Sequence, residues 1–313
     1  MVNKCIITGA TGYIGSHVLK YLLDEGWDVH VVADPKFGFD NIKKVMSQID
    51  VFDYSGDVSS LCSYFKEVQA DVVFHLAAAV ITNYKPEQVP VLIQSNVQFG
   101  TEILEAMKGS NTRIFVGTGS YWQNYNSEGY NPVDLYAATK EAFEQIIQYY
   151  VDAYGYRVVT LKLFDVYGED DRRPKIWNLL REIAGTDRSL DVSPGEQMLD
   201  LVHVSDVSAA YQCAYNYLRE KETSCREVFG VYTGERMSLK EAIKTFEHFS
   251  AKTININFGG KKYKEREVMQ PISNLPKVPG WKPEISPRKG LEKLAGGVII
   301  RFLLYHRPQL LAA

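Results

Sequence analysis

Short apolar runs alternate with helical patterns along the first half of the chain. Apolar residues are nearly continuous over 4–9, 28–34, 71–79, 113–119 and 156–168, which is typical of strands that are buried on both faces. Between these runs, apolar positions recur with helical spacing over 15–26, 58–69, 91–107 and 136–155. The alternation predicts an α/β fold with a doubly wound parallel sheet, because strand–helix–strand crossovers are right-handed.

The alternation ends near Gly168. We expect residues 1–168 to form mainly a dinucleotide-binding domain and residues 169–295, with short elements, prolines and charges, mainly a smaller substrate-binding lobe, with elements of the two interleaved. Residues 296–313 are an apolar tail that carries Arg301, His306 and Arg307. The tail is too short and too charged to span a bilayer. We expect a last helix packed on the body, and an amphipathic helix touching a membrane or a partner is the less favoured alternative.

Composition narrows the class of protein. The 313 residues are 45% hydrophobic, with a net charge of -3 and a pI near 6.1, so nothing favours nucleic acid as a partner. The four cysteines are far apart and lack metal-ligand spacing, which indicates reduced thiols and no metal site. No apolar signal region follows the N-terminus, and we therefore expect a cytoplasmic protein.

The segment TGATGYIGSH places three glycines between a predicted strand and a predicted helix. Glycine allows a tight turn and lets the backbone approach a pyrophosphate, while the helix N-terminus attracts the phosphates. This is the pattern of a Rossmann-type site for NAD or NADP. Its expected contacts are Gly9, Thr11, Gly12, Tyr13, Ile14 and Gly15.

The second strand ends near Asp34, where a carboxylate can bind the adenosine ribose of NAD. Ala33 and Lys36 leave room for the phosphate of NADP, so the choice stays open. Asp57 and Val58 begin a helix and are expected at the adenine, although an N-cap role for Asp57 is an equal alternative. Leu76, Ala77 and Ala78 lie at the end of the third apolar run, 71–79, and are expected under the cofactor. His75 is expected to be a buried strand histidine.

Tyr136 and Lys140 lie one turn apart on the same face of a predicted helix. A nearby ammonium favours phenolate, and we expect it to lower the pKa of the Tyr136 phenol, which then moves a proton while hydride moves at a nicotinamide. Thr118, at the end of a strand, is expected to hydrogen-bond the same substrate oxygen. Thr118, Tyr136 and Lys140 are therefore the predicted catalytic residues, and the last two are also expected to contact the cofactor.

The chain resembles an extended short-chain dehydrogenase/reductase of the nucleotide-sugar epimerase/dehydratase kind. The likeness covers nearly the whole chain and rests on TGATGYIG, GDV, FHLAA, SNVQFGT, YAATK, LKLFDVYG, SPGEQ, LVHVSDVSAAY and GWKP. It implies that Phe164 and Val166 approach the nicotinamide and that Asp165 contacts the substrate. It also implies a homodimer through the helices that follow Val97 and Tyr136.

Two departures from the family pattern bear on the reaction. Dehydratases of this family follow the threonine with an aspartate and a glutamate, and here Gly119 and Ser120 stand in their place. Elimination of water is therefore disfavoured, and Ser120 becomes a predicted substrate contact. Asp165 replaces a usual asparagine, which exchanges an amide for a carboxylate.

The third departure concerns the diphosphate. Leu199 replaces a common arginine, so the diphosphate grip is expected to be lost or to shift to Arg172, Arg173, Lys264 or Arg266. As an alternative, those side chains are ordinary surface charges.

What remains is chemistry at one carbinol carbon, and the C-terminal segments resemble those of CDP-abequose synthase-like 4-keto-sugar reductases. We expect reduction of a 4-keto-6-deoxyhexose linked to a nucleotide, with NADPH, as in deoxysugar biosynthesis for lipopolysaccharide O-antigen. An NAD-dependent 4-epimerase is the first alternative. A reductase of another small carbonyl compound and a cofactor-sensing binding protein without catalysis are the others.

Overall fold

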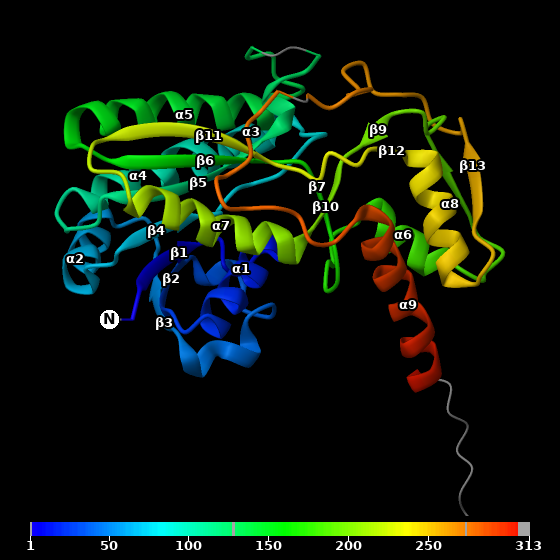
Figure 1. The fold of residues 1–313 in the computed structure, drawn as a ribbon, viewed down its shortest axis with the longest axis horizontal. Helices are drawn as coiled ribbons and strands as arrows, with labels where there is room; N and C mark the ends of the chain where they lie inside the picture. The colour runs from blue at the N-terminus through cyan, green and yellow to red at the C-terminus, as the bar shows by residue number, and fades with distance from the viewer. Residues whose placement is uncertain (1, 127–128, 273, 306–313) are drawn as a thin grey trace, which may run out of the picture.

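The computed structural model of the chain describes residues 2–126, 129–272 and 274–305, and it describes side chains as far as Gly296. Figure 1 shows a larger body built around one twisted sheet and a smaller lobe beside it.

The strands and helices of the large body alternate as the apolar pattern predicts. Their bounds are β1 (Lys4–Thr8), α1 (Tyr13–Asp24), β2 (Asp28–Ala33), β3 (Asp50–Asp53), α2 (Val58–Val68), β4 (Val72–His75), α3 (Val89–Ile93), α4 (Phe99–Met107), β5 (Ile114–Ser120), α5 (Leu135–Tyr154), β6 (Arg157–Leu163), α7 (Val204–Arg219) and β11 (Cys225–Val231). Within the described residues the sheet has seven strands, all parallel, in the order β11-β6-β5-β4-β1-β2-β3.

This order confirms the doubly wound Rossmann-type fold. The chain leaves β1 toward β2 on one side and returns to β4 on the other, so the direction of winding reverses between β1 and β4. A crevice opens at such a switch point beyond the carboxyl ends of the strands, and there open parallel sheets bind their ligands.

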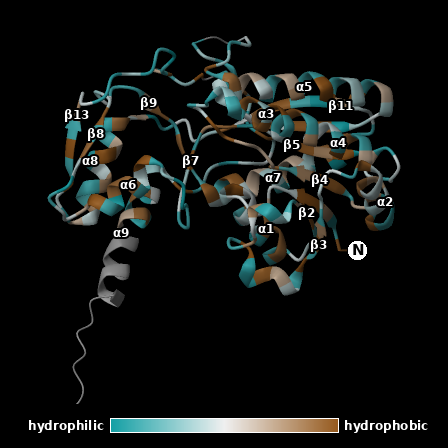
Figure 2. Cartoon of the chain, turned by 180° about the vertical axis from the view of Figure 1, so that it is seen from behind, coloured by the Kyte–Doolittle hydropathy of each residue, from teal (hydrophilic) through white to brown (hydrophobic). Residues whose placement is uncertain are grey.

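Helices cover both faces of the sheet. One apolar core packs α1 and α7 against the sheet through residues such as Leu19, Phe74 and Tyr211. The other packs α2, α4 and α5 through Phe65, Phe115 and Ile147. Figure 2 shows apolar residues concentrated along the strands and the inner sides of these helices. Each strand is therefore buried on two sides, which explains the continuous apolar runs.

The smaller lobe has its own core. It consists of β7 (Asp165–Tyr167), α6 (Ile176–Ile183), β8 (Ser189–Val192), β9 (Met198–Leu199), β10 (Leu201–His203), β12 (Met237–Ser238), α8 (Leu239–Ser250), β13 (Asn255–Phe258) and α9 (Pro287–Tyr305). Trp177, Phe246 and Leu291 are among its buried residues. Because α7 and β11 follow residue 168 yet belong to the large sheet, no single cut separates the two bodies.

The C-terminal segment begins as a packed helix. Leu291, Leu294 and Ala295 of α9 are buried against the lobe. The apolar tail was predicted over residues 296–313, and its residues 306–313 lie outside the described residues. A search of the described helices for one long and apolar enough to cross a bilayer finds none.

Candidate active site

The loop between β1 and α1 forms an open cradle lined by backbone. Gly9 has φ +73°, and a Cβ atom there would lie 2.5 Å from the Ala77 nitrogen. A Cβ on Gly15 would lie 2.1 Å from the Gly9 oxygen, so this glycine lets helix and loop touch. No side chain caps α1 at Gly12. The first amides of this helix are thus left for an anion, and the cradle fits the pyrophosphate of a dinucleotide.

Polar groups after β2 are bonded to one another and to the glycine loop. Asp34 accepts a hydrogen bond from the Lys36 nitrogen at 3.0 Å and forms an ion pair with the Lys36 ammonium. Asn41 donates to the Thr11 oxygen at 2.8 Å, which ties this segment to the glycine loop. Asp57 caps α2 through the Ser59 nitrogen at 3.0 Å, and this is the N-cap role that its position also allowed.

The carboxyl end of β4 lies beside the cradle. Leu76, Ala77 and Ala78 are half-buried there. His75 is 1% exposed and its Nδ1 lies 2.9 Å from the Thr8 hydroxyl. Burial first, and the Lys140 charge second, lower the pKa of His75 to about 3. His75 is therefore a neutral residue of the sheet, as expected.

Tyr136 and Lys140 both lie buried on α5, behind an N-cap formed by Asp134. Burial, and then the charge of Asp134, raise the pKa of the Tyr136 phenol, while a hydrogen bond from Ser120 and the charge of Arg173 lower it. Arg173 is the positive charge that lowers it here, and the expectation for Lys140, which involves a bound nicotinamide as well, stays a prediction. Burial lowers the pKa of Lys140 to about 8, against the opposing effect of Glu144.

Two hydroxyls occupy the end of β5. Thr118 donates a hydrogen bond to the His75 oxygen at 2.8 Å and lies 2.6 Å from the Tyr211 hydroxyl. Ser120 is 8% exposed, accepts a hydrogen bond from the Trp122 nitrogen at 3.2 Å, and is one of the groups that lower the pKa of Tyr136. The role predicted for Thr118 stays a prediction, because its hydroxyl is bonded to other groups here.

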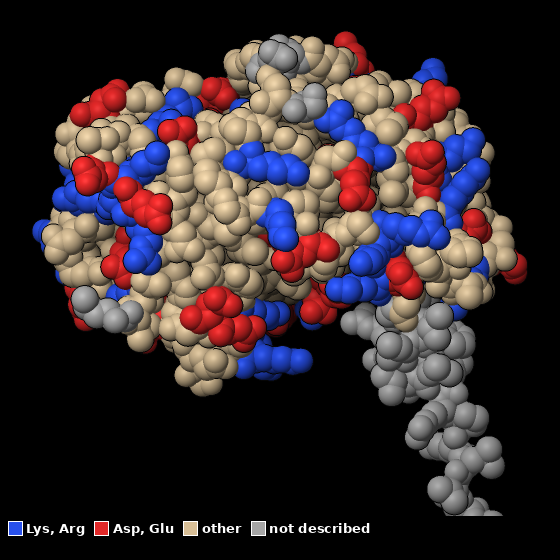
Figure 3. All heavy atoms as spheres, in the orientation of Figure 1, with Lys and Arg blue, Asp and Glu red and all other residues tan. Residues whose placement is uncertain are grey.

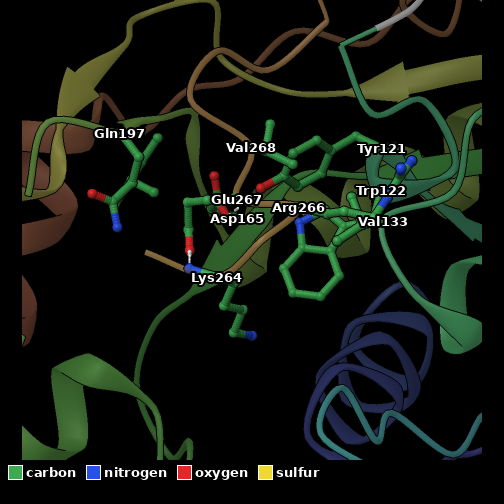
Figure 4. A pocket seen from close by; sticks show the side chains of 10 residues that line it. Tyr121, Trp122, Val133, Asp165, Gln197, Lys264, Arg266, Glu267 and Val268 are labelled. Atoms are coloured by element: carbon green, nitrogen blue, oxygen red, sulfur yellow. Dashed lines mark hydrogen bonds between the residues drawn. The ribbon is translucent and has the colours of Figure 1, made fainter. Parts of the chain in front are cut away.

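A cavity of about 430 Å³, open to solvent, lies where the large body meets the lobe. Figure 4 shows Tyr121, Trp122, Asp165 and Glu267 around it. Asp165 accepts hydrogen bonds from the Tyr121 hydroxyl and the Asp200 nitrogen, each at 3.1 Å. Burial is the main reason why the pKa of Asp165 rises to about 7. The residue predicted to contact substrate is thus a carboxyl group that titrates near neutrality.

A row of aromatic rings leads away from Tyr121 of the cavity wall. The rings of Tyr121 and Phe164 stack with centroids 4.7 Å apart, and Tyr232 follows Phe164 at 4.9 Å. Phe164 is buried and Val166 is half-buried next to Asp165.

The predicted cationic contacts separate into two groups. The guanidinium of Arg266 lies 4.3 Å from the Tyr125 ring centroid, and the Lys264 ammonium lies 5.5 Å from that of Trp122, both at the cavity. Arg172 is exposed, whereas its neighbour Arg173 lies 4.6 Å from the ring centroid of Tyr13, over the glycine loop. Leu199 lines the cavity as an apolar side chain.

The sequence did not indicate three side chains that lie at the site. Tyr211 bonds Thr118 from the middle of α7, and Tyr121 bonds Asp165. Asn96 holds both backbone groups of Ala79, its Oδ1 2.7 Å from the nitrogen and its Nδ2 3.0 Å from the oxygen. The asparagine within SNVQFGT was a usable signal, since a polar residue in an apolar helix needs buried partners. The two tyrosines carried no local signal.

Known proteins share both the sequence and the fold. Residues 5–227 match the NAD dependent epimerase/dehydratase family. The chain is 26% identical over 297 residues to the CDP-abequose synthase of Salmonella muenchen, which covers 93% of this chain and 97% of that protein. It is also 26% identical over 310 residues to a putative UDP-glucose 4-epimerase of Methanocaldococcus jannaschii, covering 92% and 96%.

Among solved structures, the UDP-glucuronic acid 4-epimerase of Bacillus cereus with UDP-glucuronic acid and NAD has a TM-score of 0.81 at 24% identity, covering 95% of this chain and 99% of that one. The UDP-glucose 4-epimerase of Thermotoga maritima has a TM-score of 0.80 at 21% identity, covering 96% and 99%. The doubly wound sheet, the glycine cradle and the family match together place this chain in the NAD dependent epimerase/dehydratase family.

Proposed function

We propose that the protein is an NAD(P)-dependent oxidoreductase that acts at C4 of a nucleotide-linked sugar and most favourably reduces a 4-keto-6-deoxyhexose. One observation carries the proposal. The buried phenol of Tyr136 meets a hydroxyl at the end of β5, beside an open dinucleotide cradle, while Gly119 and Ser120 stand where a dehydratase needs acids. The likeness to CDP-abequose synthases over most of both chains supports this choice.

The residues of the chain divide the work between binding and proton transfer. A bound nicotinamide supplies the hydride donor or acceptor. Gly9, Gly12 and Gly15 hold its pyrophosphate on backbone amides. Tyr136 gives a proton to the C4 oxygen during reduction and takes one during oxidation. Lys140 supplies a positive charge that favours the phenolate.

The cofactor contacts at the ribose favour NAD. The carboxylate of Asp34 can accept a hydrogen bond from a ribose 2′-hydroxyl and would repel a 2′-phosphate. Lys36 is already paired with this carboxylate, so a second anion would compete for it. The proposed reduction would use NADPH, and binding of NADPH would require the ion pair between Asp34 and Lys36 to open. Titration with NADH and NADPH by calorimetry measures the preference.

The substrate pocket is the cavity at Asp165. Lys264 and Arg266 are the proposed contacts of the diphosphate in place of the arginine that Leu199 replaces. Ser120 and Asp165 are the proposed contacts of the sugar. Arg172 stays a proposed diphosphate contact, although its side chain is exposed. Arg173 lies nearer to the glycine loop, beside the ring of Tyr13.

The decisive experiment supplies CDP-glucose and CDP-4-keto-6-deoxyglucose separately, each with oxidised or reduced cofactor, and follows the products by mass. We expect hydride transfer only to the keto sugar, with one cofactor consumed per product. Loss of water from CDP-glucose would contradict the reading of Gly119 and Ser120.

A 4-epimerase is the second candidate, because the solved structures that resemble this chain include an NAD-bound 4-epimerase. Exchange of C4 epimers without net cofactor consumption would establish it. A protein that binds the cofactor and turns over no nucleotide sugar or other small carbonyl compound would be the proposed sensor instead.

We also propose a cytoplasmic homodimer that pairs through α4 and α5, the helices that follow Val97 and Tyr136, together with α3, which precedes α4. Val91, Ile93 and Tyr149 are apolar residues exposed there by 46%, 43% and 57%. Light scattering on the purified protein measures the mass. Charges of both signs are mixed on the face seen in Figure 3, which gives no reason to expect nucleic acid.

A further inference from the structure

Arg173 is a cation that lies over the glycine loop, on the segment that follows β7. Its guanidinium carbon lies 4.6 Å from the ring centroid of Tyr13, the first residue of α1. The backbone of the segment packs on the same side chain, since a Cβ atom on Gly168 would lie 3.0 Å from the Tyr13 hydroxyl. The smaller lobe thus brings a positive charge to the cradle between β1 and α1.

A buried carboxylate holds this guanidinium in place. Asp171 accepts hydrogen bonds from the Arg173 Nε at 2.8 Å and from its Nη2 at 2.7 Å. It also accepts one from the Arg173 backbone nitrogen at 3.0 Å. The Asp171 side chain is 7% exposed, whereas that of Arg173 is 35% exposed. Because a forked pair fixes the plane of the guanidinium, Arg173 is oriented before any ligand arrives.

The pair with Asp171 leaves hydrogens of Arg173 available. A guanidinium has five N–H donors, and Asp171 takes two of them, which leaves three. Among the residues that the structure describes, Asp171 is the only hydrogen-bond acceptor found for the Arg173 side chain. Glu169, the nearest other acid of the segment in sequence to be paired, has its carboxylate 3.0 Å from the His203 ring instead. The three remaining donors can therefore serve a ligand.

The charge of that ligand follows from the position of Arg173. The N-terminus of a helix carries a partial positive charge, and no side chain caps α1 at Gly12. A second positive charge beside this helix end is unfavourable unless an anion joins the two. Asp171 offsets part of the charge, but it approaches the guanidinium and not the amides of α1. The first amides of α1 and the free donors of Arg173 together favour one incoming anion.

We infer that Arg173 binds the pyrophosphate of the dinucleotide, which then lies between the N-terminus of α1 and the lobe, and that Asp171 positions Arg173 for this contact. The inference rests on the proposed oxidoreductase function. It moves Arg173 from the diphosphate of the sugar, where the sequence analysis placed it, to the cofactor. Release of the cofactor then requires the segment after β7 to move away from Tyr13.

Calorimetry of Arg173→Met with NADH, in the absence of any sugar, tests the inference. Loss of a hydrogen-bonded charge should raise the Kd roughly tenfold to a hundredfold. ADP-ribose has the pyrophosphate without the nicotinamide, and it should lose affinity by the same factor. The Kd of the variant should also depend less on salt than that of the wild type. Arg172→Met changes the exposed neighbour and is the matched control, with an unchanged NADH Kd.

Three results would overturn the inference: an unchanged NADH Kd in Arg173→Met, an equal loss in Arg172→Met, or a loss for NADH that ADP-ribose does not share. A loss for CDP-glucose alone would return Arg173 to the sugar's diphosphate. Arg173→Gln, which can still donate to Asp171, carries the same comparison should Arg173→Met melt below the wild type. If the wild type binds neither NADH nor NADPH, the proposed function itself fails, whereas equal binding by wild type and variant refutes only the role of Arg173.

Discussion

Replacement of Asp165 by asparagine should remove a pH-dependent cost of folding. The carboxyl group lines the cavity, with Oδ1 at the Tyr121 hydroxyl and Oδ2 at the Asp200 nitrogen. An asparagine can keep both bonds, because its oxygen can accept from the Asp200 nitrogen while its NH₂ donates to Tyr121. Asp165→Asn therefore imitates the protonated acid at every pH.

The sign of the effect follows from the direction of the pKa change. Burial raises the pKa of Asp165 from 3.8 to about 7 in the folded protein. Between these values the unfolded chain is ionised and the folded chain keeps its proton. The free energy of unfolding should fall as the pH rises from about 4 to 7 and should level off above that.

The magnitude has an upper limit set by the same interval. Roughly three pH units at about 1.4 kcal/mol each give about 4 kcal/mol. Because the cavity is open to solvent, we expect about half of this, on the order of 2 kcal/mol. The stability gained by Asp165→Asn over the wild type should grow from pH 4 to pH 7 and then remain constant.

Urea unfolding of both proteins at pH 5, 6, 7 and 8 measures this difference. Asp24→Asn, which changes an exposed carboxylate at the end of α1, is the matched control and should follow the wild type. If the free energies of unfolding of Asp165→Asn and the wild type depend on pH in parallel, the Asp165 carboxyl does not titrate near neutrality. The argument that burial raises its pKa is then refuted.

The remaining predictions concern the cofactor and the proton. Tyr136→Phe should fold and bind the dinucleotide but lose most turnover, and near-normal kcat would refute its role as acid and base. Wild-type activity that depends on the Lys140 ammonium should fall as the pH rises through about 8. Lys140→Met should have low activity and should not show this fall near pH 8. An unchanged pH profile together with an unchanged cofactor Kd would contradict this role of Lys140. Gly12→Val should keep its melting temperature yet lose dinucleotide binding, because a Cβ there meets only the Gly9 oxygen, at 3.2 Å, while a branched side chain blocks the cradle. Gly15→Ala should instead lower the melting temperature, since its Cβ would overlap the Gly9 backbone; equal melting temperatures for the two variants, or native affinity in calorimetry for Gly12→Val, would count against this distinction.

The local features of the fold were predictable and the distant ones were not. The strands β1, β4 and β5 lie in the interior of the sheet and read as apolar runs. The edge strand β11 carries Arg226 and Glu227 on its half-buried part, so its pattern is broken and the alternation seemed to end at Gly168. Two-sided burial produces the signal, and an edge strand lacks it.

The same distinction holds at the site. The glycine cradle and the Tyr136–Lys140 pair depend on spacing within one loop or one helix, and both were found from the sequence. The hydrogen bonding of Thr118 depends on Tyr211, which is 93 residues away from Thr118 along the chain. The pKa of Asp165 depends on its burial in the folded chain, so no local pattern carries it.

The cavity at Asp165 has a consequence for the order of folding. Its walls come from Tyr121, Asp165, Leu199 and residues 264–268, which are far apart in the sequence. Contacts of such long range close late, because the loops between them must first lose their conformational freedom. During synthesis the dinucleotide cradle, complete once β4 has formed, precedes the pocket by nearly two hundred residues of chain. A nascent chain thus acquires the loop for a pyrophosphate well before it has a place for its substrate.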